Sequence, residues 1–349
     1  MPFSVDQPGE FRMRIMISTL ILSMCASVGS WCVAAQQIKL PLKRVLDVPL
    51  TGRTSRFDYQ SLDLSAGRLY IAHLGDSAVT VFDTRAEKEI AAIEHIKNVH
   101  GVLTVSKIGR IYATATGTDE LAVIDGKTFN ILARVPTGDY PDGIAYAAAE
   151  NKLYVSNKKG KSDTVIDAKT NKVIGTIKFG AEAGNSLYDE VTNRVYVALG
   201  GRDRLVEIDP ESDKIVAQYE LHGCKGAHGL AVDSKGKVAF VACEDNSTLV
   251  AFDLRFKKLL ALYRVGGGPD VLAFDTGLRR LYVSAESGTL AIFDEGDEGS
   301  LRTVGFDFFA KGAHTVSVDS QTHLVYFPLS DINGKPLIRI EAPNDLRNR

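Results

Sequence analysis

The sequence has no excess of charge of either sign. It contains 41 Lys plus Arg against 43 Asp plus Glu among 349 residues. A nucleic-acid partner usually requires a basic face, and an anionic membrane surface attracts the same kind of face. The composition therefore indicates neither partner. A short basic run at Lys158, Lys159 and Lys161 is typical of a solvated loop.

The sequence also lacks the short motifs that mark common catalytic sites. It has no Gly-x-Ser-x-Gly elbow, no His-Glu-x-x-His and no Walker loop. A functional site therefore has to be sought in the arrangement of the chain and not in one local motif.

Only one stretch is both apolar and long, residues 15–28, and it follows Arg12 and Arg14. It is too short for a membrane span, and small residues near position 35 fit a signal-peptidase site. We expect residues 1–35 to be a cleaved Sec-type signal peptide, with Met13 as a second candidate start. This predicts export to a bacterial periplasm or to the exterior, with no membrane span after cleavage.

The remaining chain repeats itself with a period of 41 to 44 residues. An aromatic residue recurs in step at Tyr70, Tyr112, Tyr154, Tyr196, Phe240, Tyr282 and Tyr326. An aspartate recurs in phase with it at Asp83, Asp125, Asp167, Asp209, Asp253 and Asp294. Each repeat holds four short runs rich in Val, Ile and Tyr, separated by turn-forming residues, which is typical of antiparallel strands.

Four strands repeated at this period predict an all-β, seven-bladed β-propeller in which each blade is a four-stranded antiparallel sheet. The strand-like segment 44–52 has no first three strands before it, and the last repeat has no fourth strand after it. We therefore expect the N-terminal strand to complete the last blade in a 3+1 closure, which removes an open sheet edge. The single domain would span residues 36–343, followed by a frayed tail at 344–349.

The second-strand sequences resemble a known repeat. Leu-Tyr-Ile-Ala (69–72), Leu-Tyr-Val-Ser (153–156) and Leu-Tyr-Val-Ser (281–284) are similar to the Tyr-Val-Thr-Asn repeat, and Pro-Asp-Gly occurs at 141–143. The chain thus resembles the YncE-like family of exported seven-bladed propellers, which belongs to the wider WD40-like repeat superfamily. The resemblance implies a fold and no common catalytic motif. The only tryptophan is Trp31, so the Trp-Asp signature of WD40 blades is absent from the repeats.

The residues at the start of each repeat are the candidate site. In a propeller, first strands line the central channel, so one polar position per blade would ring its mouth. That position reads Asp58, His100, Asp142, Asn185, His228, Asp270 and His314. Imidazoles suit transition metals, so His100, His228 and His314 are candidate metal ligands. We assign the other four, with Arg56, to ligand binding.

Other interpretations of these residues stay open. Asp and Asn also favour the tight turn into a strand, and side chains spread around seven blades need not converge on one ion. Arg56, His73, Glu244 and Glu286 are expected at the same surface, where ordinary loop polarity would also explain them.

After signal cleavage only Cys224 and Cys243 remain. Their positions before the first strand and at the end of the second strand of one repeat place them at the same end of adjacent strands. An oxidising compartment favours a disulfide between them. Two buried thiols, or thiolates beside a metal, are the alternatives.

The sequence therefore predicts an exported propeller that binds a small ligand, a metal species or an envelope protein at its channel mouth without catalysis, as a monomer. The alternative is a metal-dependent enzyme, such as a lactone hydrolase or lyase, that uses the same ring. No cofactor is assigned, and a transition metal or metallocofactor is the candidate.

Overall fold

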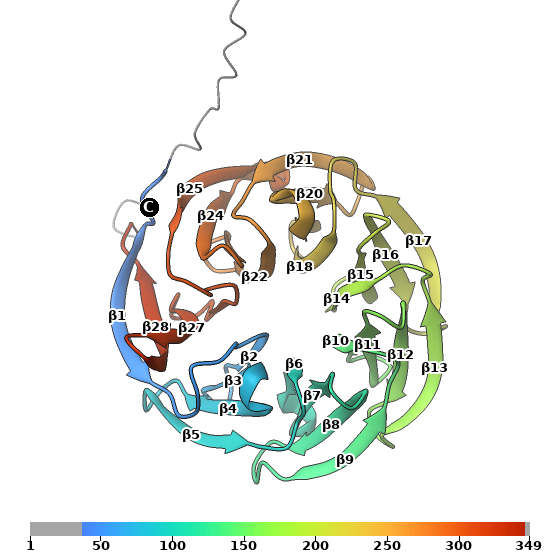
Figure 1. Ribbon diagram of the computed structural model, residues 1–349. Coiled ribbons are helices and arrows are strands. Elements are labelled where there is room, and N and C mark those ends of the chain that lie inside the picture. Colours follow the sequence, from blue (N-terminus) through green and yellow to red (C-terminus); the bar gives the residue numbers. More distant parts are fainter. Residues whose placement is uncertain (1–36, 346–349) are drawn as a thin grey trace, which may run out of the picture. The chain divides into compact units, whose positions relative to one another are not determined.

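The repeats fold into seven four-stranded antiparallel sheets arranged in a ring (Figure 1). The structure is a computed structural model that describes residues 37–345. The predicted signal peptide and the last four residues of the predicted tail lie outside the described residues. The predicted all-β, seven-bladed fold is confirmed.

The first three blades follow each other along the chain. Their strands are β2 (Gln60–Asp63), β3 (Arg68–His73), β4 (Ala78–Asp83) and β5 (Lys88–Ile93); β6 (Val99–Val105), β7 (Arg110–Ala115), β8 (Glu120–Asp125) and β9 (Ile131–Pro136); β10 (Pro141–Ala147), β11 (Lys152–Asn157), β12 (Ser162–Asp167) and β13 (Lys172–Lys178).

Blades four to six continue in the same way. Their strands are β14 (Ala183–Asp189), β15 (Arg194–Leu199), β16 (Arg204–Asp209) and β17 (Lys214–Glu220); β18 (Ala227–Asp233), β19 (Val238–Cys243), β20 (Thr248–Asp253) and β21 (Lys258–Arg264); β22 (Pro269–Asp275), β23 (Arg280–Ala285), β24 (Thr289–Glu295) and β25 (Leu301–Phe308).

The seventh blade is built from both ends of the described chain. It contains β26 (Ser317–Val318), β27 (Val325–Ile332), β28 (Lys335–Pro343) and the N-terminal strand β1 (Leu42–Pro49), which pairs antiparallel with β28. Arg339 on β28 donates two 2.8 Å hydrogen bonds to Asp47 on β1. The predicted 3+1 closure is therefore observed, and Figure 1 shows β1 as the outermost strand beside β28.

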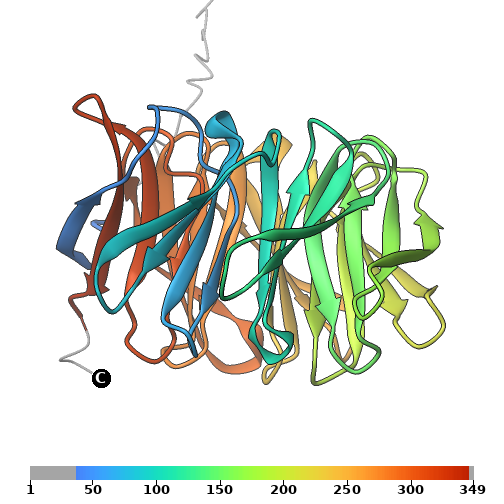
Figure 2. The ribbon, with the colours of Figure 1, turned by 90° about the horizontal axis from the view of Figure 1, so that it is seen from below.

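The four short helices of the described chain are single 3₁₀ turns in connections, at η1 (Leu74–Asp76), η2 (Ser106–Ile108), η3 (Glu244–Asn246) and η4 (Asp297–Gly299). Within residues 37–345 no helix has the length and apolar character needed to cross a bilayer. The strands of each blade run between the two faces of the ring (Figure 2).

The core lies between the blades. The recurring second-strand aromatics are all at most 2 % exposed, because each is covered by a neighbouring blade. Tyr154 of blade three, for example, shares one apolar cluster with Val195 and Val197 of blade four. The outermost strands alternate instead, as in β17, because one of their faces meets solvent.

Most of the recurring aspartates at the end of the third strands are turn residues; Asp294 instead pairs with Arg280 and Arg302. Asp83 accepts hydrogen bonds from the backbone N–H groups of Arg85 and Ala86, at 2.9 and 2.8 Å. Asp125 and Asp167 do the same for the residues that follow them. This is the Asx-turn chemistry that reverses the chain into the fourth strand.

Two residues of the predicted frayed tail are held against the propeller. Asn344 hydrogen-bonds the backbone of Pro41 and Leu42. Asp345 accepts two hydrogen bonds, at 2.9 and 2.7 Å, from the fully buried guanidinium of Arg280. The first two residues of the predicted tail therefore contact the propeller, and fraying of the tail stays a prediction.

The predicted disulfide between Cys224 and Cys243 is present, with their Cα atoms 5.4 Å apart. It links the approach to β18 with the end of β19, and both residues are buried. The bond closes a loop of the chain with a sequence separation of 19 residues.

Replacing both cysteines by serine should lower the free energy of unfolding by about 3 kcal/mol, because the cross-link no longer restricts the unfolded chain. Urea denaturation of the oxidised wild type and of the double variant measures this difference. The wild type in reducing agent should behave like the variant. Equal midpoints for all three samples would contradict the expectation.

Candidate functional site

The start of the first strand is irregular in five of the seven blades, and in four of them this irregularity redirects a polar side chain. The antiparallel register shifts near the start of β6, β10, β14, β18 and β22. A bulge bends a strand and redirects a side chain that regular pairing would place on a blade face. His100, Asp142, His228 and Asp270 are the second residues of four of these strands.

These four residues, together with Arg56 and Asp58, define what we call the upper mouth of the channel. They line a cavity of about 520 Å³ with Tyr59, Lys158, Glu244 and Glu286. Asp58, Asp142, His228 and Asp270 are each at most 5 % exposed. The position predicted from the repeats therefore collects buried polar side chains in one place.

Blade four departs from the predicted alignment by one residue. Ala183 and Ser186 pair as Pro141 and Ile144 do in blade three, so Gly184 is the counterpart of Asp142. Asn185 lies one position deeper and lines a separate section of the channel. Its assignment to ligand binding stays a prediction.

Asp58 and Asp270 form a buried acidic pair with Arg56 beside them. The Arg56 guanidinium lies 3.4 Å from Asp58 Oδ2 and 3.5 Å from Asp270 Oδ2, and it also pairs with Glu286 at 2.6 Å. Burial and then the charge of Asp142 raise the pKa of Asp58 to about 8, although Arg56 opposes the shift. Burial and then Asp58 likewise raise the pKa of Asp270 well above its ordinary value.

His228 faces three carboxyl groups at once. Its Nε2 lies 3.6 Å from Glu244, 3.7 Å from Asp270 and 3.9 Å from Asp142, and the Tyr59 hydroxyl approaches it to 3.0 Å. Burial, and then the charge of Lys158, lower the pKa of His228. The imidazole is therefore neutral near neutral pH.

His314 joins the acidic pair from the seventh blade. One of its ring nitrogens lies with Asp58 and Asp270 in a group whose ligand atoms are all within 4.8 Å of one another. Its Nδ1 lies 3.1 Å from the Gly312 carbonyl oxygen, which can only accept, so Nδ1 carries the proton. Burial lowers the pKa of His314 to about 4, so this side chain is neutral as well.

His100 forms hydrogen bonds with residues outside the acidic pair and outside the carboxyl groups that surround His228. Its Nδ1 contacts the Asn98 carbonyl and the Thr116 hydroxyl, and its Nε2 contacts the Tyr140 hydroxyl at 3.1 Å. The two groups of potential ligands found among the described residues contain His228 or His314 but not His100. A metal held by all three histidines stays a prediction.

Of the further residues expected at this surface, Glu244 and Glu286 line the cavity and His73 does not. His73 stacks on Phe57 with ring centroids 4.2 Å apart and lines a neighbouring pocket with Asp76.

Lys158 is a turn residue whose side chain is only partly exposed, whereas a fully solvated loop lysine was expected. It lines the cavity, and its Nζ lies 4.0 Å from Glu244. Burial opposes its charge, yet Glu244 and Asp142 hold its pKa above the ordinary value. The sequence shows three lysines in one loop and no signal that selects the first, since only the path of the loop turns it inward.

Tyr59 is the other residue that the repeat alignment missed. Its hydroxyl lies between His228 and Asp270, at 3.0 and 3.5 Å. Strand alternation would point it away from Asp58, but β2 begins only at Gln60, so strict alternation does not yet apply.

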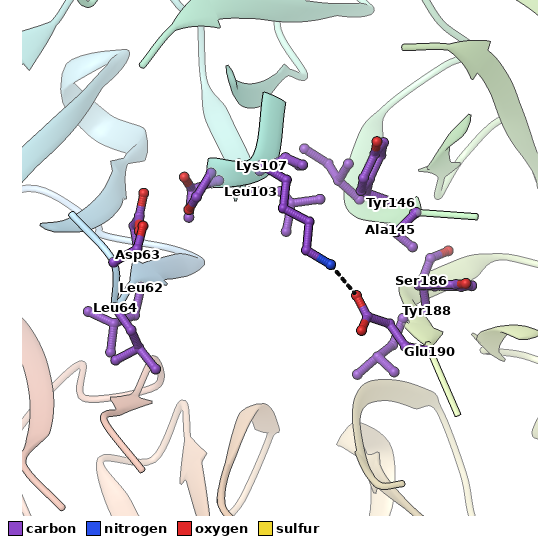
Figure 3. Close-up of a pocket in the computed structure, with 17 residues that line it drawn as sticks. Leu62, Asp63, Leu64, Leu103, Lys107, Ala145, Tyr146, Ser186, Tyr188 and Glu190 are labelled. Atoms are coloured by element: carbon purple, nitrogen blue, oxygen red, sulfur yellow. Dashed lines mark hydrogen bonds and ion pairs between the residues drawn. The ribbon is translucent and has the colours of Figure 1, made fainter. Parts of the chain in front are cut away.

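The opposite end of the channel holds a larger and more apolar cavity of about 910 Å³. Figure 3 shows it between the C-terminal ends of the first strands, with Leu62, Leu103 and Tyr146 among its walls. The exposed side chains of Lys107 and Glu190, which form an ion pair 3.8 Å long, also line it. An exposed ion pair contributes little energy and gives no particular chemistry, so the upper mouth is the stronger candidate site.

No family model and no curated protein matches this sequence. Solved structures do match its fold. Virginiamycin B lyase from Staphylococcus aureus is 11 % identical with a TM-score of 0.71, over 86 % of this chain and 99 % of that one. Kuenenia stuttgartiensis hydrazine synthase is 15 % identical with a TM-score of 0.69, over 88 % of this chain and 98 % of that one.

The WD40 repeats of RRP9 are similar in the same way, at 12 % identity and a TM-score of 0.72, over 87 % of this chain and 98 % of that one. At these identities the likeness shows a shared propeller architecture alone. Lyase, synthase and WD40 repeats all occur among the matches, so the fold is compatible with both binding and catalysis.

Replacing Arg56 with Gln should make the stability of the protein fall more steeply with pH. Carboxyl groups whose folded pKa is raised stabilise the folded state least at high pH, where folding must bury them ionised. Arg56 offsets part of that cost. The loss of unfolding free energy in Arg56→Gln should be roughly 1 kcal/mol larger at about pH 9 than at about pH 5.

Denaturant titrations of both proteins at the two pH values measure this difference. An equal loss of unfolding free energy at both pH values would show that Arg56 does not offset the cost of burying Asp58 and Asp270 in their ionised form.

Proposed function

We propose that this protein is a non-catalytic binding propeller whose upper mouth takes a cationic ligand. The proposal includes export to the periplasm or exterior behind the signal peptide at 1–35, and relationship to the YncE-like propellers. The export proposal rests on the sequence of residues 1–35, and the relationship rests on the Tyr-Val-Thr-Asn-like strands.

The observation that carries the proposal is the imbalance of charge in the upper mouth. Two cations, Arg56 and Lys158, line the cavity. Five carboxyl groups face them, those of Asp58, Asp142, Glu244, Asp270 and Glu286. The histidines add no positive charge, because burial keeps their pKa low.

The raised pKa values of Asp58 and Asp270 also support a positively charged ligand. Buried acids that repel one another retain protons until a positive charge arrives. A bound cation would replace those protons and remove the repulsion. Cation affinity should therefore rise with pH up to about 8, where Asp58 ionises.

A metal-dependent hydrolase or lyase is the second candidate. The observation that favours it is the Tyr59 hydroxyl between His228 and Asp270, which could relay a proton between an imidazole and a carboxyl group. The fold likeness to virginiamycin B lyase is compatible with it. Turnover of lactones that fails in Tyr59→Phe would favour this candidate over binding alone.

A thermal-shift panel tests the proposal. Spermidine, tetramethylammonium and divalent metal chlorides should include at least one cation that raises the melting temperature, and citrate should not. A ligand at a hundred times its dissociation constant adds about 2.7 kcal/mol of stability. The Asp58→Asn/Asp270→Asn variant should lose the shift, and Glu190→Gln, at the opposite mouth, should keep it.

Stabilisation by citrate, or no response to any cation, would contradict a cationic ligand. An unchanged shift in the Asp58→Asn/Asp270→Asn variant would move the site elsewhere.

A further inference from the structure

The carboxylate oxygens around His228 Nε2 lie beyond hydrogen-bonding distance, while the Tyr59 hydroxyl lies 3.0 Å from this nitrogen. Three carboxylate oxygens, from Asp142, Glu244 and Asp270, lie 3.6 to 3.9 Å from this nitrogen. Hydrogen bonds of this kind would be about 2.7–3.2 Å long. Ligand atoms of His228, Glu244 and Asp270 all lie within 4.8 Å of one another, and Asp142 Oδ2 approaches the His228 Nε2 atom of this group.

The spacing is close to that of ligands around one metal ion. Bonds of about 2.0–2.2 Å in a tetrahedral site place neighbouring ligand atoms roughly 3.3–3.6 Å apart. The separations to Glu244 and Asp270, 3.6 and 3.7 Å, approach this range directly. Asp142 Oδ2 is 3.9 Å from Nε2 but lies outside the group formed by His228, Glu244 and Asp270, so its carboxylate would have to swing inward to become the fourth ligand.

Asp142 supplies an independent sign that a ligand is expected here. Its side chain is buried, and its Oδ1 has no hydrogen-bond partner among the described residues. A buried carboxylate oxygen without a partner costs free energy unless a cation or a donor reaches it. Asp142 Oδ2 lies toward His228 Nε2, so the group is aimed into the cluster.

Gly184 is the reason that blades three and five can meet at this point. A Cβ at Gly184 would lie 2.8 Å from His228 Cα and 3.0 Å from its Nδ1. Any side chain there would displace His228 from the cluster. The position where other blades carry Asp or His is therefore open in blade four, and Asp142 and His228 approach each other across it.

The other side of Asp270 already has a cation. Asp58, Asp270 and His314 form a second group of candidate ligands, but the Arg56 guanidinium contacts both carboxylates there. A metal ion bound to the same two carboxylates would be repelled by the Arg56 guanidinium. On the His228 side the nearest cation is Lys158, whose Nζ lies 4.0 Å from Glu244 Oε2, while the Glu244 oxygen that faces His228 Nε2 is Oε1. The His228 side therefore leaves more room for an ion than the side that Arg56 occupies.

We propose that a divalent first-row transition-metal ion such as Zn²⁺ binds between His228, Asp142, Glu244 and Asp270. This inference rests on the proposed cation-binding function and names the ligand class. One imidazole nitrogen with three carboxylates suits Zn²⁺, Co²⁺ or Mn²⁺, whereas Ca²⁺ and Mg²⁺ prefer oxygen alone. Tyr59 would exchange its contact with Nε2 for one with Asp270.

Calorimetric titration of chelator-treated protein with ZnCl₂ tests the site. The wild type should bind one equivalent, and Asp142→Asn and His228→Gln should each weaken binding at least about tenfold. Glu190→Gln and His222→Ala remove a carboxylate and an exposed imidazole outside the cluster, and they should leave the affinity unchanged. Circular dichroism confirms that each variant is folded.

Co²⁺ provides a second measurement that needs no variant. Co²⁺ in a four-coordinate site gives intense visible absorption, and Zn²⁺ should abolish it by displacement. If Co²⁺ gives only the weak spectrum of the hydrated ion, the proposed coordination is wrong.

The outcomes separate this inference from the proposed function. Stabilisation by organic cations without Zn²⁺ binding would overturn the metal site and leave the cationic ligand standing. Zn²⁺ binding of equal strength in Asp142→Asn would place the metal elsewhere and overturn the inference. No response to any cation would overturn both.

Discussion

The ring depends on one repeated contact, the burial of each blade's middle strands against its neighbours. The second-strand aromatics are almost completely excluded from solvent, so no blade can bury its core alone. A closed ring is the solution that leaves no blade unpaired, and the pairing of β1 with β28 completes it. The ion pair between Asp47 and Arg339 and the contacts of Asp345 with Arg280 hold the two chain ends to this closure.

Closure of the ring also determines which side chains meet in the central channel. The first strands converge there, and bulges at their starts direct single side chains inward, so residues distant in sequence become neighbours. Packing holds these side chains in place whether or not their charges are balanced. This is how the fold can keep the carboxyl groups of Asp58 and Asp270 close together, although burial and their mutual repulsion raise the pKa of both. The upper mouth is thus an acidic concavity in which the proposed cation would reduce the repulsion between the carboxylates.

Much of the fold was predictable from the sequence because the repeat period along the chain determines the number and composition of the blades. The recurring tyrosines and aspartates gave the blade number, and the unmatched strands at the two ends gave the closure. The pairing of Cys224 with Cys243 was expected because they lie at the same end of adjacent strands. Each of these features depends on spacing along the chain, which a sequence displays directly.

The site was only partly predictable, because it depends on register and on loop paths. A one-residue error in blade four put Asn185 in the place of Gly184, and the absence of a side chain there is what lets Asp142 meet His228. Lys158 and Tyr59 were missed since no repeat position marks them. His100 shares its repeat position with His228, yet its hydrogen bonds to Thr116 and Tyr140 separate it from the carboxylates. Equivalent positions do not imply equivalent partners.

The central claim is that the upper mouth holds a cation on the His228 side of Asp270. Crystals grown with Zn²⁺, measured above and below the zinc absorption edge, test it most directly. The account predicts one strong anomalous peak bounded by His228, Asp142, Glu244 and Asp270, with Arg56 still beside Asp58. A peak among Asp58, Asp270 and His314, or none in the channel, would contradict it.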